Sequence, residues 1–150
     1  MWKEALAEVK KVTNQFNMKY NDGATEAELQ KFKSEVKGKF GFELPQDYIH
    51  LLQEMNGFEF NGFIIYGVDE KFLDKKPKQR LTGFIELSEF WYENEHQKQY
   101  IFIGESNITW YVYDLQSYKY IELDNPGGEE MHYYDTFDEI ITKLLTDSIL

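Results

Sequence analysis

Three segments rich in aromatic and β-branched residues follow one another closely in the second half of the chain. They are YIFIG (100–104), ITWYVYDL (108–115) and YKYIEL (118–123), and such residues are enriched in β-strands. The last two are separated only by a turn at DLQS or LQSY, and parallel strands cannot be joined by so short a connection. The segments therefore predict an antiparallel meander, which the rest of the chain must cover.

Another strand and two loops are predicted around this meander. GFIIYG (62–67) is a short apolar run bounded by glycines, which is typical of a buried strand. FIELSEFWYENEH (84–96) predicts a short strand followed by a helix that Ser88 caps. DEKFLDKKPKQR (69–80) has no hydrophobic period and predicts an exposed loop, as does DNPGGEE (124–130) by its composition.

Two helices are predicted in the first 40 residues. Apolar residues at helical spacing, from Trp2 to Phe16, predict a helix over residues 2–20. After a turn, Thr25 and Glu28 form a capping box, in which each side chain satisfies a free backbone N–H of the other residue. The capping box predicts that a second helix begins there.

A third helix is predicted between Pro45 and Gly57, because proline suits a first helical turn and Asn56-Gly57 tolerates the left-handed conformation of a helix stop. A last helix closes the chain, where Thr136 and Glu139 form a second capping box ahead of an amphipathic run. Helices at the N-terminus, in the middle and at the C-terminus, with strands between them, indicate the α+β class.

We expect a single domain over residues 1–150, because a chain of this length buries enough surface for one core. Its mainly antiparallel sheet should have about four to six strands, with the helices packed on it. The N-terminal helix, within residues 1–22, either packs on this domain or reaches outward.

The chain has no cysteine, and no apolar run is long enough to cross a membrane. This composition excludes disulfides, thiolate zinc sites and cysteine nucleophiles. The first residues are amphipathic and charged, and they lack the apolar core of a signal peptide. We therefore expect a cytoplasmic protein.

The negative charge is confined to one half of the sequence. Residues 1–80 carry 13 basic and 13 acidic side chains, whereas residues 81–150 carry 3 basic and 14 acidic ones. Phosphate binding needs a basic surface, so a nucleic-acid ligand is disfavoured. A cationic protein partner is favoured, because opposite potentials speed encounter.

No pattern of catalytic or metal-binding residues stands out. His50, His96 and His132 are far apart, and none has a metal-ligand spacing. Adjacent acids such as Glu129-Glu130 are interpreted as exposed, whereas a hydrolase needs two carboxylates with separated pKa values. We expect no enzyme activity, no metal and no cofactor; a carboxylate-based hydrolase is the alternative that a deep acidic pocket would favour.

Aromatic residues make up 17% of the chain, which is too many for all of them to be buried. In the central aromatic strand, Trp110 and Val112 share one face, and Tyr111 and Tyr113 share the other. One face has to pack on helices, and the other is free to be open. An acidic, tyrosine-rich surface can place apolar anchors inside a charged rim, as protein-binding patches do.

The segment LPQDYIHLLQEMNGF (44–58) resembles the signature of the SUKH superfamily, which includes the fungal Smi/Knr cell-wall regulators and many bacterial immunity proteins. The matching residues are Leu44, Pro45, Tyr48, Leu52, Asn56 and Gly57. Further matches to the family pattern are Trp91, Ile103-Gly104, the strand from Tyr111 to Asp114, and Phe137. The resemblance runs from about Thr25 to Leu145 and is strongest to small Bacillus members of the YobK type. Ser106-Asn107 departs from the Gly-Asp that the family often has, which argues against a shared ligand site in that turn.

The resemblance implies a non-enzymatic fold. Bacterial members are commonly encoded beside polymorphic toxins, often nucleases, and neutralise them by direct binding. The acidity agrees with a nuclease partner, because a nuclease presents a basic cleft to its substrate. The leading hypothesis is an immunity protein that occludes a cationic surface of its cognate toxin, with no nucleic acid or membrane as ligand. The alternative is a scaffold or peptide-binding module without a toxin partner, and the oligomeric state stays open.

Candidate toxin contacts lie in loops and at strand ends of the acidic half. The acidic candidates are Glu105, Glu122, Asp124, Glu129, Glu130 and Asp135, with Tyr118, Tyr120 and Tyr133 as anchors.

Overall fold

Six strands form one antiparallel sheet in which each strand lies beside its neighbours in sequence. A computed structural model describes residues 1–150. The strands are β1 (Phe58–Phe60), β2 (Phe63–Ile65), β3 (Tyr100–Glu105), β4 (Thr109–Asp114), β5 (Tyr120–Asp124) and β6 (Glu130–Tyr134). The predicted meander is confirmed as β3–β4–β5, and the α+β class with a mainly antiparallel sheet is confirmed as well.

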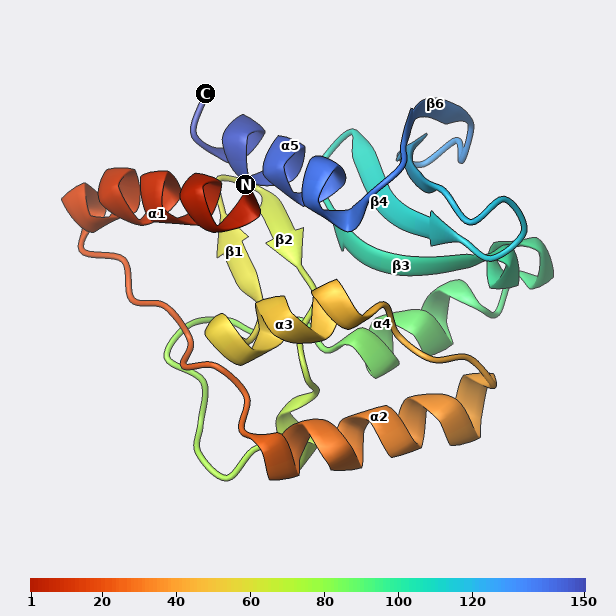
Figure 1. Cartoon of the computed structure of the whole chain (residues 1–150), viewed down its shortest axis with the longest axis horizontal. Coiled ribbons are helices and arrows are strands. Elements are labelled where there is room, and N and C mark those ends of the chain that lie inside the picture. The colour runs from red at the N-terminus through yellow and green to blue at the C-terminus, as the bar shows by residue number, and fades with distance from the viewer.

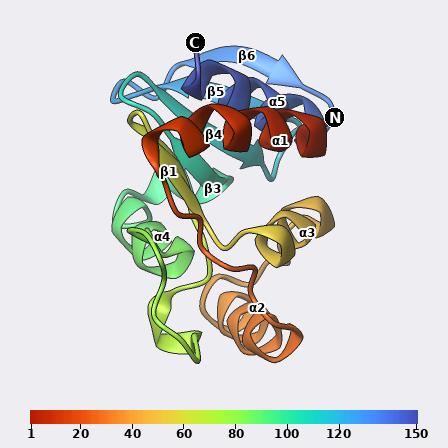
Figure 2. The same ribbon diagram turned by 90° about the vertical axis from the view of Figure 1, so that its left-hand side faces the viewer.

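Five helices and three short 3-10 turns cover this sheet. The helices are α1 (Trp2–Thr13), α2 (Glu26–Phe40), α3 (Gln46–Glu54), α4 (Phe84–Trp91) and α5 (Phe137–Ser148). The turns are η1 (Asn14–Phe16), η2 (Glu70–Phe72) and η3 (Glu95–Gln99). Helix α5 lies along the upper side of the sheet beside α1, whereas α2, α3 and α4 gather at its lower end (Figures 1 and 2).

Helices cover the meander on both faces. On one face the Trp91 ring of α4 stacks on Phe102, with the ring centroids 5.7 Å apart. On the other face the Phe137 ring of α5 contacts Tyr120 at 6.0 Å. Neither face of β4 is therefore open, and Trp110 and Tyr111 on opposite faces are both buried.

Helix α1 is shorter than the helix predicted over residues 2–20. It ends at Thr13, and after η1 the chain turns at Asn17, whose φ of 55° is left-handed. Phe16, predicted on the apolar face, is 67% exposed as a result. The remaining face packs along α5 (Figure 1), and the Trp2 backbone N–H donates to Asp138 Oδ1 at 2.6 Å.

Helix α3 ends earlier than predicted, and Asn56 has a different task from the one expected. The helix stops at Glu54, and Asn56 is not in a left-handed conformation. Its buried side chain instead accepts a hydrogen bond from the Val68 N–H at 2.7 Å and donates to the Val68 carbonyl at 3.3 Å. Tyr48 similarly donates from its hydroxyl to the Tyr66 carbonyl. These two side chains therefore fasten α3 to the chain that leaves β2.

The predicted strand and Ser88 cap before α4 are wrong. The helix begins at Phe84, and Ser88 lies buried inside it. Asp69 caps the helix instead: its carboxylate accepts hydrogen bonds from the Ile85 N–H at 2.9 Å and the Glu86 N–H at 3.0 Å. Asp69 is consequently buried, although it begins a segment predicted as an exposed loop.

Strands β1 and β6 were not predicted. A two-residue turn at Asn61 and Gly62 joins β1 to β2, and the φ angles of these residues, 55° and 82°, suit such a hairpin. Strand β6 includes Glu130, which was assigned to a loop, and four of its five residues are exposed. Its polar sequence lacks the apolar alternation that signals a half-buried strand.

The two predicted capping boxes differ. In α2 the box is complete, since Glu28 N–H donates to Thr25 and Thr25 N–H donates to Glu28. In α5 only half of it forms: Thr136 accepts from the Glu139 N–H at 3.2 Å, but the Glu139 carboxylate accepts from the Thr136 hydroxyl rather than from its backbone. The start of each helix is nevertheless predicted correctly.

Two glycine substitutions should have opposite effects on stability. Gly57 has φ +80°, and a Cβ there would lie 2.7 Å from Leu81 Cδ1. Gly57→Ala should therefore lower the free energy of unfolding by about 1–2 kcal/mol, the cost of a left-handed L-residue. Gly38 lies inside α2 with no atom near the Cβ position, so Gly38→Ala should raise the free energy of unfolding by about 0.5–1 kcal/mol. Urea unfolding measures both changes. An unchanged midpoint for Gly57→Ala would contradict the left-handed conformation of Gly57.

Candidate functional site

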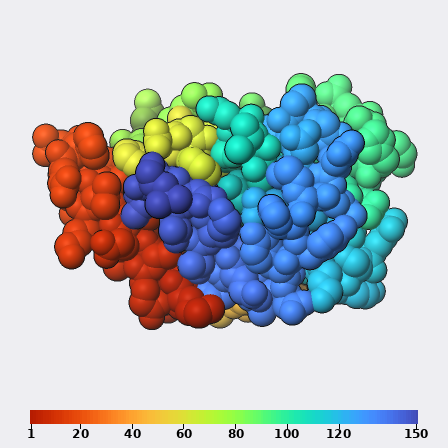
Figure 3. Space-filling model, turned by 90° about the horizontal axis from the view of Figure 1, so that it is seen from above, coloured from red at the N-terminus to blue at the C-terminus, as the bar shows by residue number.

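The predicted toxin-contact residues lie around the β5–β6 hairpin and the ends of β3 and β4, but they differ in exposure. Tyr118, Glu129, Glu130, Tyr133 and Asp135 are exposed. Glu105 and Asp124 are half-buried, and Glu105 accepts a hydrogen bond from the Tyr66 hydroxyl at 2.7 Å. The space-filling view shows the hairpin beside α5 on the face that also carries α1 (Figure 3).

Tyr120 and Glu122 are buried and cannot reach a partner in this structure. Both point to the face that α5 covers, where Tyr120 contacts Phe137. Glu122 is 5% exposed, and its carboxylate accepts a hydrogen bond from the Tyr134 hydroxyl. Their position at a strand end suggested exposure, but the pleat of β5 turns them under the helix.

Three carboxylates remain together at the turn between β5 and β6. We call Asp124, Glu129 and Glu130 the acidic hairpin end. The three lysines of the second half pair with other acids: Lys98 with Glu95 at 3.0 Å, Lys143 with Asp147, and Lys119 with Asp135. No lysine or arginine forms an ion pair with the acidic hairpin end, so its negative charge faces solvent.

The carboxylate of Glu130 is held by two tyrosines. The Tyr133 hydroxyl donates to Oε1 at 2.8 Å, and the Tyr100 hydroxyl from β3 donates to Oε2 at 3.3 Å. The hydrogen bond to Glu130 raises the pKa of Tyr133. Burial, together with the Glu130 charge, raises the pKa of Tyr100 to about 12. Both tyrosines are therefore neutral donors at neutral pH.

A cleft of about 280 Å³ lies between η3 and the hairpin. Tyr100 and Trp110 line it together with His96 and the backbone at Gly127 and Gly128. Trp110 is 3% exposed, and its Nε1–H has no hydrogen-bond acceptor. The cleft was not predicted, because η3 and the hairpin are about 30 residues apart in sequence.

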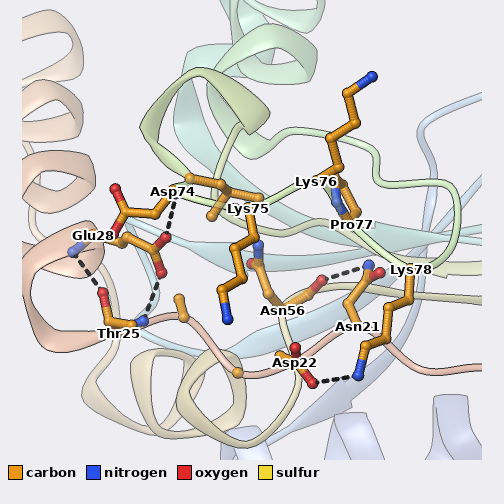
Figure 4. A pocket seen from close by; sticks show the side chains of 13 residues that line it. Asn21, Asp22, Thr25, Glu28, Asn56, Asp74, Lys75, Lys76, Pro77 and Lys78 are labelled. Atoms are coloured by element: carbon orange, nitrogen blue, oxygen red, sulfur yellow. Dashed lines mark hydrogen bonds and ion pairs between the residues drawn. The ribbon is translucent and has the colours of Figure 1, made fainter.

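A second cavity, of about 190 Å³, lies between the start of α2 and the loop after η2 (Figure 4). Its polar groups bond mainly to one another. Glu28 accepts hydrogen bonds from the Thr25 and Asp74 N–H groups, each at 2.8 Å, and Asp22 pairs with Lys78 at 2.9 Å. These contacts tie the loop to the domain. Lys75 extends over the cavity (Figure 4).

Two buried carboxylates have pKa values below their ordinary range. Burial opposes ionisation of Glu28, but the Thr25 and Asp74 donors outweigh it and lower the pKa. Burial likewise opposes ionisation of Asp114, and the Gln116 N–H and the Ser117 hydroxyl outweigh it there. Asp114 thereby holds the β4–β5 turn.

These lowered pKa values predict a loss of stability in acid. A carboxylate whose pKa is lower in the folded state stabilises it above the unfolded pKa of about 4, and this contribution disappears as the pH falls through the folded pKa. The free energy of unfolding should therefore drop below about pH 4. Urea unfolding from neutral to acid pH measures this dependence.

Asp114→Asn should make the free energy of unfolding less dependent on pH in acid, and should lower it at neutral pH. Asp74→Asn is the matched control, because the exposed Asp74 carboxylate makes no hydrogen bond. If the free energy of unfolding changes with pH equally steeply in wild type and Asp114→Asn, the β4–β5 turn does not depend on the charged form of Asp114.

Neither a membrane-spanning helix nor a metal-binding group is found. None of the five helices combines the length and the apolar character that crossing a bilayer requires. No three His, Asp or Glu side chains come close enough to hold a metal ion.

The comparison with protein families gives a match over most of the chain. A family model described as the SMI1 / KNR4 family (SUKH-1) matches residues 23–143. The match runs from the turn before α2 into α5, so it includes the α3 signature, the whole sheet and the acidic hairpin end, but not α1. A search of curated proteins finds no match.

Proposed function

Because the chain belongs to the SMI1 / KNR4 (SUKH-1) family, we propose that it is an immunity protein that binds and neutralises a cognate toxin in the cytoplasm. The family includes immunity proteins, and its members suggest a protein partner in general. The partner in this proposal is a polymorphic toxin domain, a nuclease with a cationic surface. The protein itself performs no catalysis.

The observation that carries this proposal is the unpaired negative charge of the acidic hairpin end. A nuclease needs a basic cleft to bind phosphates. Carboxylates on this hairpin can occupy the same cleft and exclude the substrate, and an anionic face also steers the encounter with a cationic one. Tyr133 is 58% exposed beside Glu130, and it supplies apolar contact area next to the acidic hairpin end.

A scaffold or peptide-binding module is the second candidate. Strand β6 is the last strand of the sheet, and its outer edge has no neighbouring strand. An extended peptide can pair with such an edge. The two functions differ in their partners: an immunity protein forms one stoichiometric complex with its toxin, whereas a scaffold binds several partners weakly.

The acidic hairpin end should control the rate of toxin binding. The partner to test is the toxin encoded by the adjoining gene, in a catalytically inactive form. Asp124→Asn, Glu129→Gln and Glu130→Gln combined should slow association by about tenfold or more at low salt, because the steering charge is removed. Stopped-flow fluorescence measures the rate, and the wild-type rate should fall as salt rises.

A matched triple variant changes the same charge elsewhere. Glu8→Gln, Glu54→Gln and Glu70→Gln alter exposed acids on α1, α3 and η2 that make no side-chain hydrogen bond. Association of this control should stay close to wild type. An equal effect of both variants would mean that net charge, and not the hairpin, governs binding. Growth arrest by the active toxin despite co-expression of the wild-type chain would overturn the immunity function.

A further inference from the structure

The most unusual acid on the surface is Glu130, because it is exposed yet held in one orientation. An exposed glutamate ordinarily keeps its rotamer freedom, and a binding partner has to pay for fixing it. Here hydroxyls from two different strands, Tyr100 on β3 and Tyr133 on β6, each bond one carboxylate oxygen. No cation of the chain pairs with it, although each oxygen can accept more than one hydrogen bond.

An extra residue in β6 produces this arrangement. Residues three apart in a regular strand point to opposite faces, so Glu130 and Tyr133 could not meet. In the β5–β6 pair, however, His132 lies opposite Glu122 and Glu130 lies opposite Leu123, which leaves Met131 as an additional residue. This bulge puts Glu130 and Tyr133 on the same face, and bulges are known to redirect side chains in this way.

The redirected carboxylate is linked through Tyr100 to the cleft between η3 and the hairpin, although Glu130 does not itself line that cleft. Tyr100, which bonds Glu130, also lines that cleft, so an aromatic wall adjoins the negative charge. Trp110 lines it too, although its unpaired Nε1–H is buried. An oriented carboxylate therefore adjoins an aromatic wall. These groups suit a planar cation on a peptide.

We propose that this cleft receives an arginine side chain of the protein partner, with the guanidinium paired to Glu130 and lying against Tyr100. The inference rests on the proposed function, in that the partner is a cationic protein. Arginine fits better than lysine, because its planar guanidinium forms two parallel hydrogen bonds with a carboxylate and stacks on aromatic rings. The bulge and the two tyrosines fix the carboxylate in advance, which lowers the entropic cost of binding.

The test uses small probes and the whole chain, and it does not require the toxin. N-acetyl-arginine amide is titrated at low salt while NMR follows the Glu130 carboxyl carbon and the Trp110 indole N–H. N-acetyl-citrulline amide is the matched neutral probe, since it keeps the shape and the carbonyl groups. We expect saturable shifts with arginine, with citrulline weaker by about tenfold or more and the lysine analogue between them.

Three conservative variants separate this site from general acidity. Glu130→Gln should abolish saturation, and Tyr133→Phe, which removes only a hydroxyl, should weaken binding about threefold or more by freeing the carboxylate. Glu129→Gln, which removes the neighbouring charge, should have little effect. The proposal is overturned if arginine gives no saturable shift, if citrulline matches it, or if Glu129→Gln weakens it as much as Glu130→Gln does.

These outcomes are independent of the toxin experiment. Saturable arginine binding together with a toxin that does not associate would overturn the choice of partner but leave the site. Toxin association that survives Glu130→Gln, with no arginine binding, would overturn the site but leave the immunity function.

Discussion

The pairing register of the sheet determines which acidic and aromatic side chains a partner can reach. Successive residues of a strand point to opposite faces, and here both faces of the meander are covered by helices. Glu122 therefore turns under α5 and bonds Tyr134, although it lies only two residues before Asp124 at the turn. On β6 the extra residue at Met131 interrupts this alternation. Glu130 therefore lies on the same face as Tyr133 and bonds it. A shift of one residue in this register would exchange the buried and the exposed acids.

Sequence reasoning succeeded where the stabilising contacts are local. Thr25 and Glu28 are three residues apart, and their capping box predicted the start of α2 correctly. It failed where the partner is distant in sequence. The α4 cap comes from Asp69, and the side chain of Asn56 bonds Val68 across the strand hairpin. Neither contact leaves a local signal, because each depends on how the folded chain brings two segments together.

The same distinction separates the parts of the site that could be predicted. The acidic and tyrosine-rich character of the second half was visible in the sequence, and it correctly drew attention to Glu129, Glu130 and Tyr133 as exposed residues. The burial of Tyr120 and Glu122 was not visible, because it depends on where α5 crosses the sheet. Nor was the cleft, whose two walls meet only after the sheet has formed.

The charges of the folded chain are also distributed unevenly. The lysine-rich loop after η2 lies at the lower left of Figure 1, and the acidic hairpin is at the upper right. Lys75 and Lys76 have no ion-pair partner in that loop, as the acidic hairpin end has none in the hairpin. A charge separation of this kind would steer a cationic partner toward the acidic hairpin end, as the proposed function requires.

The family signature and the proposed binding surface use different residues for a physical reason. Tyr48 and Asn56 direct their polar groups to the backbone at Tyr66 and Val68, so their hydrogen-bonding capacity is used inside the domain. They can specify the fold, but they have nothing left to offer a partner. Glu129 and Glu130 cap no helix and pair with no cation of the chain, and only the two tyrosine hydroxyls bond the Glu130 carboxylate. Among proteins built on this scaffold, the choice of partner should therefore be decided by groups such as these, which the fold leaves without a charged partner.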